Sequence, residues 1–495
     1  MRAPAVMIQG AGSNVGKSIV VAGLCRVFAR RGVSVRPFKP QNMSNNAAAV
    51  KGGGEIGRAQ ALQARAAGVE ASVHFNPVLL KPESETGSQV IVQGRRHRTM
   101  RAREFGLHKR ELLPAVMESF NHVASDADLV IVEGAGSPAE INLRNDDIAN
   151  MGFATAADVP VIVVGDIERG GVIASLVGTH TVLNKSDRSL IKAFLINKFR
   201  GDPELFDDGL VAIVARTGWR SLGVLPYVPE ALRLPAEDIL DLDVQHTRTA
   251  EQKDKKIKIA VPQLDRIANF DDLDPLRLEP AVALQLVRPG KPLPLDCDLI
   301  ILPGSKNTID DLNKLKAEGW DIDIAAHIRQ GGYVLGLCGG YQMLGTLIDD
   351  PDGVEGRIGT VAGLGLLNVA SVLDAKKVVR PVRGRHLESR AIVTGYEIHL
   401  GRTTGPDTER PVFEIDGRPN GAISPDGKCM GTYVHGVFSN DGYRRAFLRH
   451  ISASKADIGQ FTYDAHVEAA LDCLAEHIES HIDTEAVYQI ACGRC

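Results

Sequence analysis

Several features that would place a protein in a specialised class are missing from this 495-residue sequence. No apolar run approaches the roughly 18 residues of a membrane span, and the segment from Met1 to Pro4 leads into a short apolar stretch without a cleavage-type site. The seven cysteines are an odd number and do not supply the two C-x-x-C pairs of a zinc ribbon, so neither a disulfide framework nor a structural zinc site is indicated. A net charge of only −4 argues against a nucleic-acid-binding surface. We therefore expect a cytoplasmic protein that binds neither membrane nor nucleic acid.

The sequence does have the length and composition of a folded multidomain protein. Hydrophobic residues make up 44% and charged residues 24%, as in globular chains, and the length corresponds to two or three domains of about 150 residues. Short apolar runs alternate with helical patterns in two series, which predicts two α/β domains with parallel sheets. We predict domains at residues 1–229 and 257–450, a polar linker at 230–256, and a helical tail at 451–495 packed on the second domain.

A glycine-rich turn follows the first predicted strand. The stretch from Gly10 to Ser18 reads GAGSNVGKS and has five residues between its outer glycines, one more than the usual phosphate loop. Such a turn before a helix directs backbone N–H groups and the helix dipole at a phosphate. Lys17 would reach the terminal phosphates and Ser18 a magnesium ion. We assign nucleotide binding to Gly10, Asn14, Gly16, Lys17 and Ser18.

Magnesium also needs a carboxylate, and parallel sheets place such ligands at the carboxyl ends of their strands. Glu133 ends an apolar strand and precedes Gly134, so it is the leading candidate, with Glu55 second. Either could instead be a solvated loop acid. Asn197 ends another apolar strand and suits recognition of a nucleotide base, or simply a strand-end turn.

A second motif lies in the other half of the chain. The sequence GLCGG at 336–340 has the Gly-x-nucleophile-x-Gly spacing of a strained strand-to-helix turn that projects a nucleophile. The following helix dipole favours negative charge at Cys338, and the N–H of Gly339 can join an oxyanion hole. A second oxyanion donor could come from Gly304, in the turn after an apolar strand.

A thiolate nucleophile needs an acid/base partner. His435 ends an apolar strand between two glycines, a position from which its side chain can reach a neighbouring strand's turn. His399, in a similar segment, is the competing candidate. We assign the role to His435.

Together these residues resemble the cobyric acid synthase family, glutamine-dependent amidotransferases of cobalamin biosynthesis. The resemblance covers nearly the whole chain. The first half is similar to dethiobiotin synthetase, which also has five residues between its P-loop glycines, and the second half resembles a class I glutamine amidotransferase domain with a flavodoxin-like fold. The segments that carry it are 10–18, 38–46, 54–60, 132–137, 335–345 and 431–438.

The resemblance implies a specific reaction. Cys338 would attack glutamine to release ammonia, with His435 as acid/base partner. ATP and Mg²⁺ would convert a substrate carboxylate to an acyl phosphate that ammonia displaces, with Lys39 near the transferred phosphate. The substrate would be adenosylcobyrinic acid a,c-diamide, a corrinoid, amidated at carboxylates b, d, e and g to give adenosylcobyric acid.

The sequence departs from the class I amidotransferase pattern at one position, and two other functions compete with the one that the resemblance implies. Class I amidotransferases have an acid two residues after the histidine, whereas this chain has Val437. We assign no third catalytic residue and consider a backbone carbonyl as the group that orients His435. The rivals are cobyrinic acid a,c-diamide synthase and a ParA-like ATP-switch protein, although Gln9 to Val15 lacks the extra lysine of ParA loops. An oligomer is compatible with the sequence.

Overall fold

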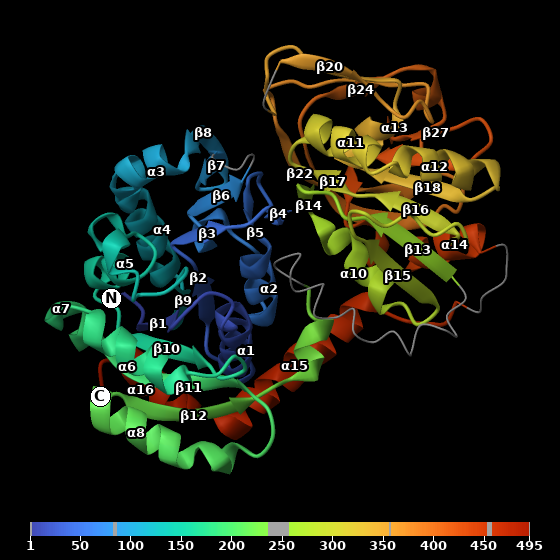
Figure 1. The fold of residues 1–495 in the computed structure, drawn as a ribbon. Helices are drawn as coiled ribbons and strands as arrows, with labels where there is room; N and C mark the ends of the chain where they lie inside the picture. Colours follow the sequence, from blue (N-terminus) through green and yellow to red (C-terminus); the bar gives the residue numbers. More distant parts are fainter. Residues whose placement is uncertain (1, 83–86, 236–256, 356–357, 453–457, 495) are drawn as a thin grey trace.

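The computed structural model describes residues 2–82, 87–235, 257–355, 358–452 and 458–494. Two domains lie side by side (Figure 1). The predicted linker begins within the short helix η5 (Pro229–Arg233), and its residues 236–256 lie outside the described part of the chain. Within the described residues, no helix has the length and apolar character needed to cross a membrane.

Six parallel strands form the central sheet of the first domain, in the order β12-β11-β10-β1-β9-β2. Their middle residues are buried, as expected for a sheet covered on both faces. Ile8 of β1 is in register with Glu133 of β9, which brings the glycine-rich turn beside that carboxylate. The strands are β1 (Ala5–Gly10), β2 (Val35–Phe38), β9 (Leu129–Glu133), β10 (Val161–Asp166), β11 (Ile191–Phe199) and β12 (Arg220–Pro226). The main helices are α1 (Lys17–Arg30), α2 (Arg58–Ala66), α4 (Leu113–Ser125), α5 (Met151–Ala157), α6 (Val172–Val182) and α8 (Asp207–Thr217).

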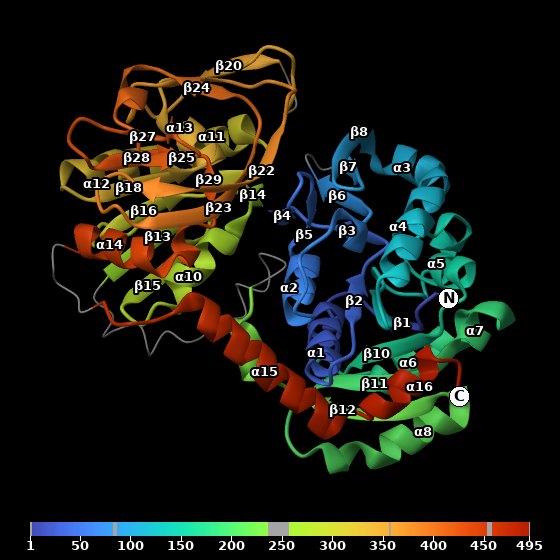
Figure 2. The same ribbon diagram turned by 180° about the vertical axis from the view of Figure 1, so that it is seen from behind.

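A smaller group of strands lies on the side of the first domain that faces the second (Figures 1 and 2). Four of them form the sheet β3-β6-β7-β8, and two form a hairpin that leads into α2. The strands are β3 (Gln41–Met43), β4 (Ala47–Ala49), β5 (Glu55–Gly57), β6 (Val78–Pro82), β7 (Gly87–Val92) and β8 (Arg95–Arg101).

The second domain combines a mostly parallel sheet, β15-β13-β16-β18-β28-β27, with an antiparallel sheet, β26-β25-β22-β23-β29. The predicted α/β class with parallel sheets is confirmed in both domains. The first sheet contains β13 (Ile257–Pro262), β15 (Val282–Val287), β16 (Leu299–Leu302), β18 (Tyr333–Leu337), β27 (Ala422–Ile423) and β28 (Cys429–Thr432). The second contains β22 (Val378–His386), β23 (Ile392–His399), β25 (Phe413–Ile415), β26 (Arg418–Asn420) and β29 (Val434–His435). The helices include α11 (Thr308–Ala317), α12 (Trp320–Arg329), α13 (Gly339–Leu344) and α14 (Asp441–Ile451).

The C-terminal helices pack on the first domain, so the prediction that the tail 451–495 covers the second domain is wrong for them. α15 (Tyr463–His481) starts beside the second domain and runs along α1 of the first, followed by α16 (Thr484–Ala491) (Figure 1). Its apolar face contacts α1 at Gly23, where a Cβ atom would lie 2.3 Å from Cδ1 of Ile478. Arg26 of α1 also forms 2.8 Å ion pairs with Glu468 and Asp472 of α15.

The two domains meet through both apolar and charged contacts. Ala47, Leu79 and Ile91 of the first domain form a buried cluster with Tyr396 and Ile398 of β23. β4, β6 and β7 of the first domain therefore pack against β23 of the second.

Candidate active sites

The glycine-rich turn forms one wall of a cavity of about 650 Å³ in the first domain. Close packing requires its outer glycines: a Cβ atom on Gly10 would lie 2.6 Å from Val15, and one on Gly16, at φ 91°, would lie 2.3 Å from the Asn197 amide. Asn14 also has a left-handed φ of 57°. Lys17 donates to the carbonyl oxygens of Gly12 at 3.3 Å and Gly136 at 3.2 Å. The five residues assigned to nucleotide binding thus lie together in one turn.

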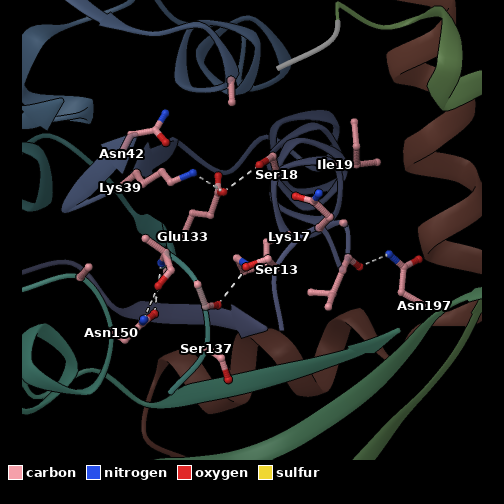
Figure 3. Close-up of a pocket in the computed structure, with 18 of the residues that line it drawn as sticks. Ser13, Lys17, Ser18, Ile19, Lys39, Asn42, Glu133, Ser137, Asn150 and Asn197 are labelled. Atoms are coloured by element: carbon pink, nitrogen blue, oxygen red, sulfur yellow. Dashed lines mark hydrogen bonds and ion pairs between the residues drawn. The ribbon is translucent and has the colours of Figure 1, made fainter. Parts of the chain in front are cut away.

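Glu133 lies at the centre of this site (Figure 3). Its Oε1 accepts hydrogen bonds from Ser18 Oγ and Lys39 Nζ, both at 2.7 Å. Its Oε2 accepts from Gln63 of α2 at 2.5 Å and from Gln60 at 3.3 Å. Burial raises the pKa of Glu133, but the charge of Lys39 and these hydrogen bonds outweigh it and hold the pKa below its usual value. The carboxylate therefore stays ionised.

The pair of Ser18 and Glu133 fits a magnesium ion. A hydroxyl and a carboxylate oxygen 2.7 Å apart can be neighbouring ligands of one small cation, and Mg²⁺ in phosphate sites takes one or two protein oxygens with phosphate and water as the rest. Lys39 donates to the same carboxylate oxygen as Ser18, and its place near a transferred phosphate stays a prediction.

Glu55 does not fit as a magnesium ligand, and that second candidate is wrong. Its carboxylate accepts from Lys81 Nζ at 2.6 Å and from Lys377 of the second domain. It is 1% exposed, and burial raises its pKa, but the charges of the two lysines outweigh this and lower it well below the usual range. Glu55 therefore has a structural role, in which its ion pair with Lys377 joins the two domains.

Asn197 stabilises the glycine-rich turn by a hydrogen bond. Its Nδ2 donates to the Val15 carbonyl at 2.8 Å, while its Oδ1 accepts from the Lys198 N–H at 2.9 Å. The residue lines the cavity, and recognition of a base by it stays a prediction.

The predicted nucleophile turn is present in the second domain. Cys338 lies between β18 and α13 with φ 53° and ψ −108°, a conformation that L-residues rarely adopt. Such strain occurs where the surrounding structure fixes a functional residue. A Cβ atom on Gly340 would lie 2.1 Å from the Leu302 carbonyl, so the turn requires glycine there. The Cys338 thiol is 3.5 Å from the carbonyl oxygen of Ile398.

His435 is fully buried and is held by a carboxylate, not by a backbone carbonyl. Its Nδ1 lies 2.6 Å from Oδ2 of Asp272, whose Oδ1 accepts from the Gly436 N–H at 2.6 Å. Asp272 belongs to the short helix η6 (Phe270–Leu273). It precedes His435 by 163 residues in the sequence. With Nδ1 donating to Asp272, Nε2 is the ring nitrogen that can exchange a proton with the thiol, and Nδ2 of Asn269 lies 3.3 Å from it. The two oxygens of Asp272 thus fix both the ring and its backbone.

The electrostatics of His435 agree with this arrangement. Burial lowers the pKa of His435, but the charge of Asp272 and hydrogen bonds with Asp272 and Cys338 outweigh it and raise the pKa to about 10. The site therefore favours the imidazolium, the form of histidine that can act as a general acid.

Gly304 and Gly339, the predicted oxyanion donors, lie close to this pair. A Cβ atom on Gly304 would be 3.3 Å from Cε1 of His435, and one on Gly339 would be 2.9 Å from the Ser305 nitrogen. Their role in the oxyanion hole stays a prediction.

His399, the competing histidine, is stacked on Tyr433 with ring centroids 3.9 Å apart. Burial and the charge of His435 lower the pKa of His399 to about 4. It is therefore neutral near pH 7 and has no carboxylate to orient it among the described residues.

Sequence reasoning missed Asp272 altogether. The segment from Asp271 to Asp274 has three aspartates in four residues, which indicates an unusual acid density but not which histidine it serves. Only the folded chain brings Asp272 to His435.

Comparisons with known proteins identify the families of both domains. Residues 6–242 match the model of the CobQ/CobB/MinD/ParA nucleotide binding domain, and residues 258–443 match that of the CobB/CobQ-like glutamine amidotransferase domain. A cobyric acid synthase of Methylobacterium nodulans is 59% identical, with 100% of both chains covered. One of Cereibacter sphaeroides is 58% identical and one of Brucella anthropi 57%, each covering 99% of this chain and 100% of its own.

Proposed function

Because this chain belongs to the cobyric acid synthase family, we propose that it amidates carboxylates b, d, e and g of adenosylcobyrinic acid a,c-diamide to give adenosylcobyric acid, with glutamine as nitrogen donor and ATP as energy source. The chain is an enzyme of the glutamine-dependent amidotransferase class. The observation that carries the proposal is the presence in one chain of a phosphate site around Glu133 and a Cys338, His435 and Asp272 site.

The nitrogen is released in the second domain. The Cys338 sulfur attacks the side-chain amide carbon of glutamine, and His435 protonates the departing nitrogen, so that a thioester and ammonia form. Water then hydrolyses the thioester to glutamate and regenerates the thiol. Asp272 keeps the proton on Nδ1 and so leaves Nε2 to exchange protons with the reacting groups.

The amide is formed in the first domain. A substrate carboxylate attacks the terminal phosphorus of ATP, which yields an acyl phosphate and ADP, and ammonia then displaces phosphate from the acyl carbon. Lys17 and Lys39 place positive charge where the phosphoryl group carries negative charge. A magnesium ion held by Ser18 and Glu133 would supply further neutralisation.

Ammonia must cross between the domains unprotonated and away from water. A cavity of about 480 Å³ supports a route in this region; its lining includes Met43 to Asn46 of the first domain and Gln263, Leu264, Asp265, Ile267 and Phe270 of the second. Met43 lines the phosphate cavity as well.

Two experiments test the proposal. Incubation of adenosylcobyrinic acid a,c-diamide with protein, ATP, Mg²⁺ and glutamine should give four successive replacements of OH by NH2 in mass spectra. No product from this corrinoid, together with amidation of cobyrinic acid at a and c, would assign the diamide synthase instead. Cys338→Ser should abolish glutamine-dependent synthesis but retain synthesis with ammonium, and equal loss of both would contradict a two-site enzyme.

A further inference from the structure

The loop that supplies Asp272 to the glutamine site is held by the other domain. We propose that Arg58, the first residue of α2 in the ATP-binding domain, is a positioning residue of the glutamine site. It would act on His435 through Asp271 and Tyr396 and would contact neither glutamine nor ATP. The inference rests on the proposed function, because it assigns a role in glutamine hydrolysis.

The first link is an ion pair between the domains. Nη2 of Arg58 lies 3.0 Å from Oδ2 of Asp271, whose side chain is 1% exposed. A buried carboxylate needs a cation or hydrogen-bond donors to stay ionised. Burial raises the pKa of Asp271, and the charge of Arg58 opposes that rise. Removal of Arg58 would therefore leave Asp271 buried without this cation, directly next to Asp272.

The second link runs from Asp271 to His435. The Tyr396 hydroxyl donates to the Asp271 carboxylate, at 3.2 Å from Oδ2 and 3.4 Å from Oδ1. The Tyr396 ring is stacked on the His435 imidazole, with centroids 5.3 Å apart and an interplanar angle of 17°. The imidazole is thus fixed at Nδ1 by Asp272 and across its face by a tyrosine that is tied to Asp271.

Two further contacts tie the same loop to the first domain. The Phe270 N–H donates to Oδ1 of Asn46, and the Ala47 N–H donates to Oδ1 of Asn269, both at 3.3 Å. Asn269 has a left-handed φ of 54°, and its Nδ2 lies 3.3 Å from Nε2 of His435. The loop 269–272 therefore takes its shape against the first domain.

α2 presents Arg58 from a fixed position. Gln60 and Gln63 of the same helix bind the Glu133 carboxylate of the phosphate site. Figure 1 shows α2 on the side of the first domain that faces the second. One nine-residue helix thus contacts the phosphate site with its side and the glutamine-site loop with its N-terminal end.

Domain attachment does not depend on Arg58 alone. The apolar cluster around Tyr396 and Ile398 and the ion pair of Glu55 with Lys377 also join the domains. A variant at Arg58 should therefore keep the domains together and alter the glutamine site selectively.

The test compares Arg58→Ala with Arg65→Ala. Arg65 lies on the same helix and forms partly exposed ion pairs with Glu468 and Asp464, so its variant controls for loss of an α2 arginine. Arg58→Ala should lower kcat for glutamine hydrolysis by about tenfold, within the range of residues that act through others, with little change in KM for glutamine. Arg58→Lys should restore part of kcat, and ammonium-dependent amidation should stay at the level of Arg65→Ala.

A double variant checks the route. Asp271→Asn removes the charge that Arg58 neutralises, so Arg58→Ala combined with Asp271→Asn should be no slower than the slower single variant if the two act together. Equal kcat for Arg58→Ala and Arg65→Ala, or a parallel loss of ammonium-dependent amidation, would overturn the proposal. Failure of the native protein to hydrolyse glutamine would instead contradict the proposed function.

Discussion

Asp272→Asn should disable glutamine hydrolysis while leaving the fold intact. The Gly436 N–H needs an acceptor, so the amide oxygen of the new side chain would take the place of Oδ1. Its NH2 group would then face Nδ1 of His435, 2.6 Å away in the native protein. Because an NH2 group can only donate, Nδ1 would become the acceptor and the ring proton would move to Nε2. The imidazole would then present a proton to the thiol instead of accepting one.

The size of the effect follows from the His435 environment. The rise of the His435 pKa from 6.5 to about 10 corresponds to about 5 kcal/mol of stabilisation of the imidazolium. Without the carboxylate charge, the main influence that opposes the lowering of the His435 pKa by burial would be lost. The equivalent substitution in serine protease triads lowers kcat by about 10⁴-fold. We expect a loss of about 10³- to 10⁴-fold in glutamine hydrolysis here.

The assay is the initial rate of glutamate release, measured beside ammonium-dependent amidation. Asp352→Asn, at an exposed position of the second domain, is the matched control and should behave as the native protein. Asp272→Asn should retain ammonium-dependent amidation, because the phosphate site is unchanged. Glutamine hydrolysis within tenfold of the control would refute the role of Asp272 in setting the His435 tautomer.

Three further predictions concern the phosphate site and the stability of the fold. Lys17→Ala should stop amidation with either nitrogen source, measured as corrinoid product, and retained synthesis would refute its assigned role. Lys81→Met removes one of the two lysines that contact the buried Glu55 carboxylate and should lower the free energy of unfolding, by less than the roughly 3–5 kcal/mol of a buried charge left without any partner, because Lys377 remains. Since the native Glu55 pKa is lowered, its stabilisation is present above the unfolded-state pKa and is lost as pH falls; the variant should unfold at a higher pH in an acid titration followed by circular dichroism. Gly23→Ala, whose Cβ would lie 2.3 Å from Ile478, should destabilise by about 1–3 kcal/mol, seen as a lower Tm by calorimetry.

The features that the sequence predicts well are those encoded within a short stretch of chain. The phosphate loop and the turn at Cys338 need glycines at fixed spacings, because a side chain at Gly10 or Gly340 would collide with neighbouring atoms. A strand before and a helix after each turn complete the pattern. Such constraints are visible without knowledge of the rest of the fold.

The features that could not be predicted from the sequence depend on contacts between residues that are distant along the chain. Glu55 lies in a glycine-rich segment that allows a ligand role, but Lys377, 322 residues later, pairs with it. Asp272 reaches His435 from a loop 163 residues earlier. The apolar spacing of α15 predicts that it is buried, yet it does not distinguish α1 from the second domain as the surface that covers it.

The packing of α15 on α1 makes the second domain an insertion within the first. The core of the first domain contains residues from Val6 to Leu234 and from Tyr463 to Ala491, with the second domain between them in sequence. During synthesis from the N-terminus, the side of α1 around Gly23 that packs on α15 would stay uncovered until α15 leaves the ribosome. The domain that is made first is therefore completed last, and a chain stopped after the second domain would expose an apolar surface that promotes aggregation.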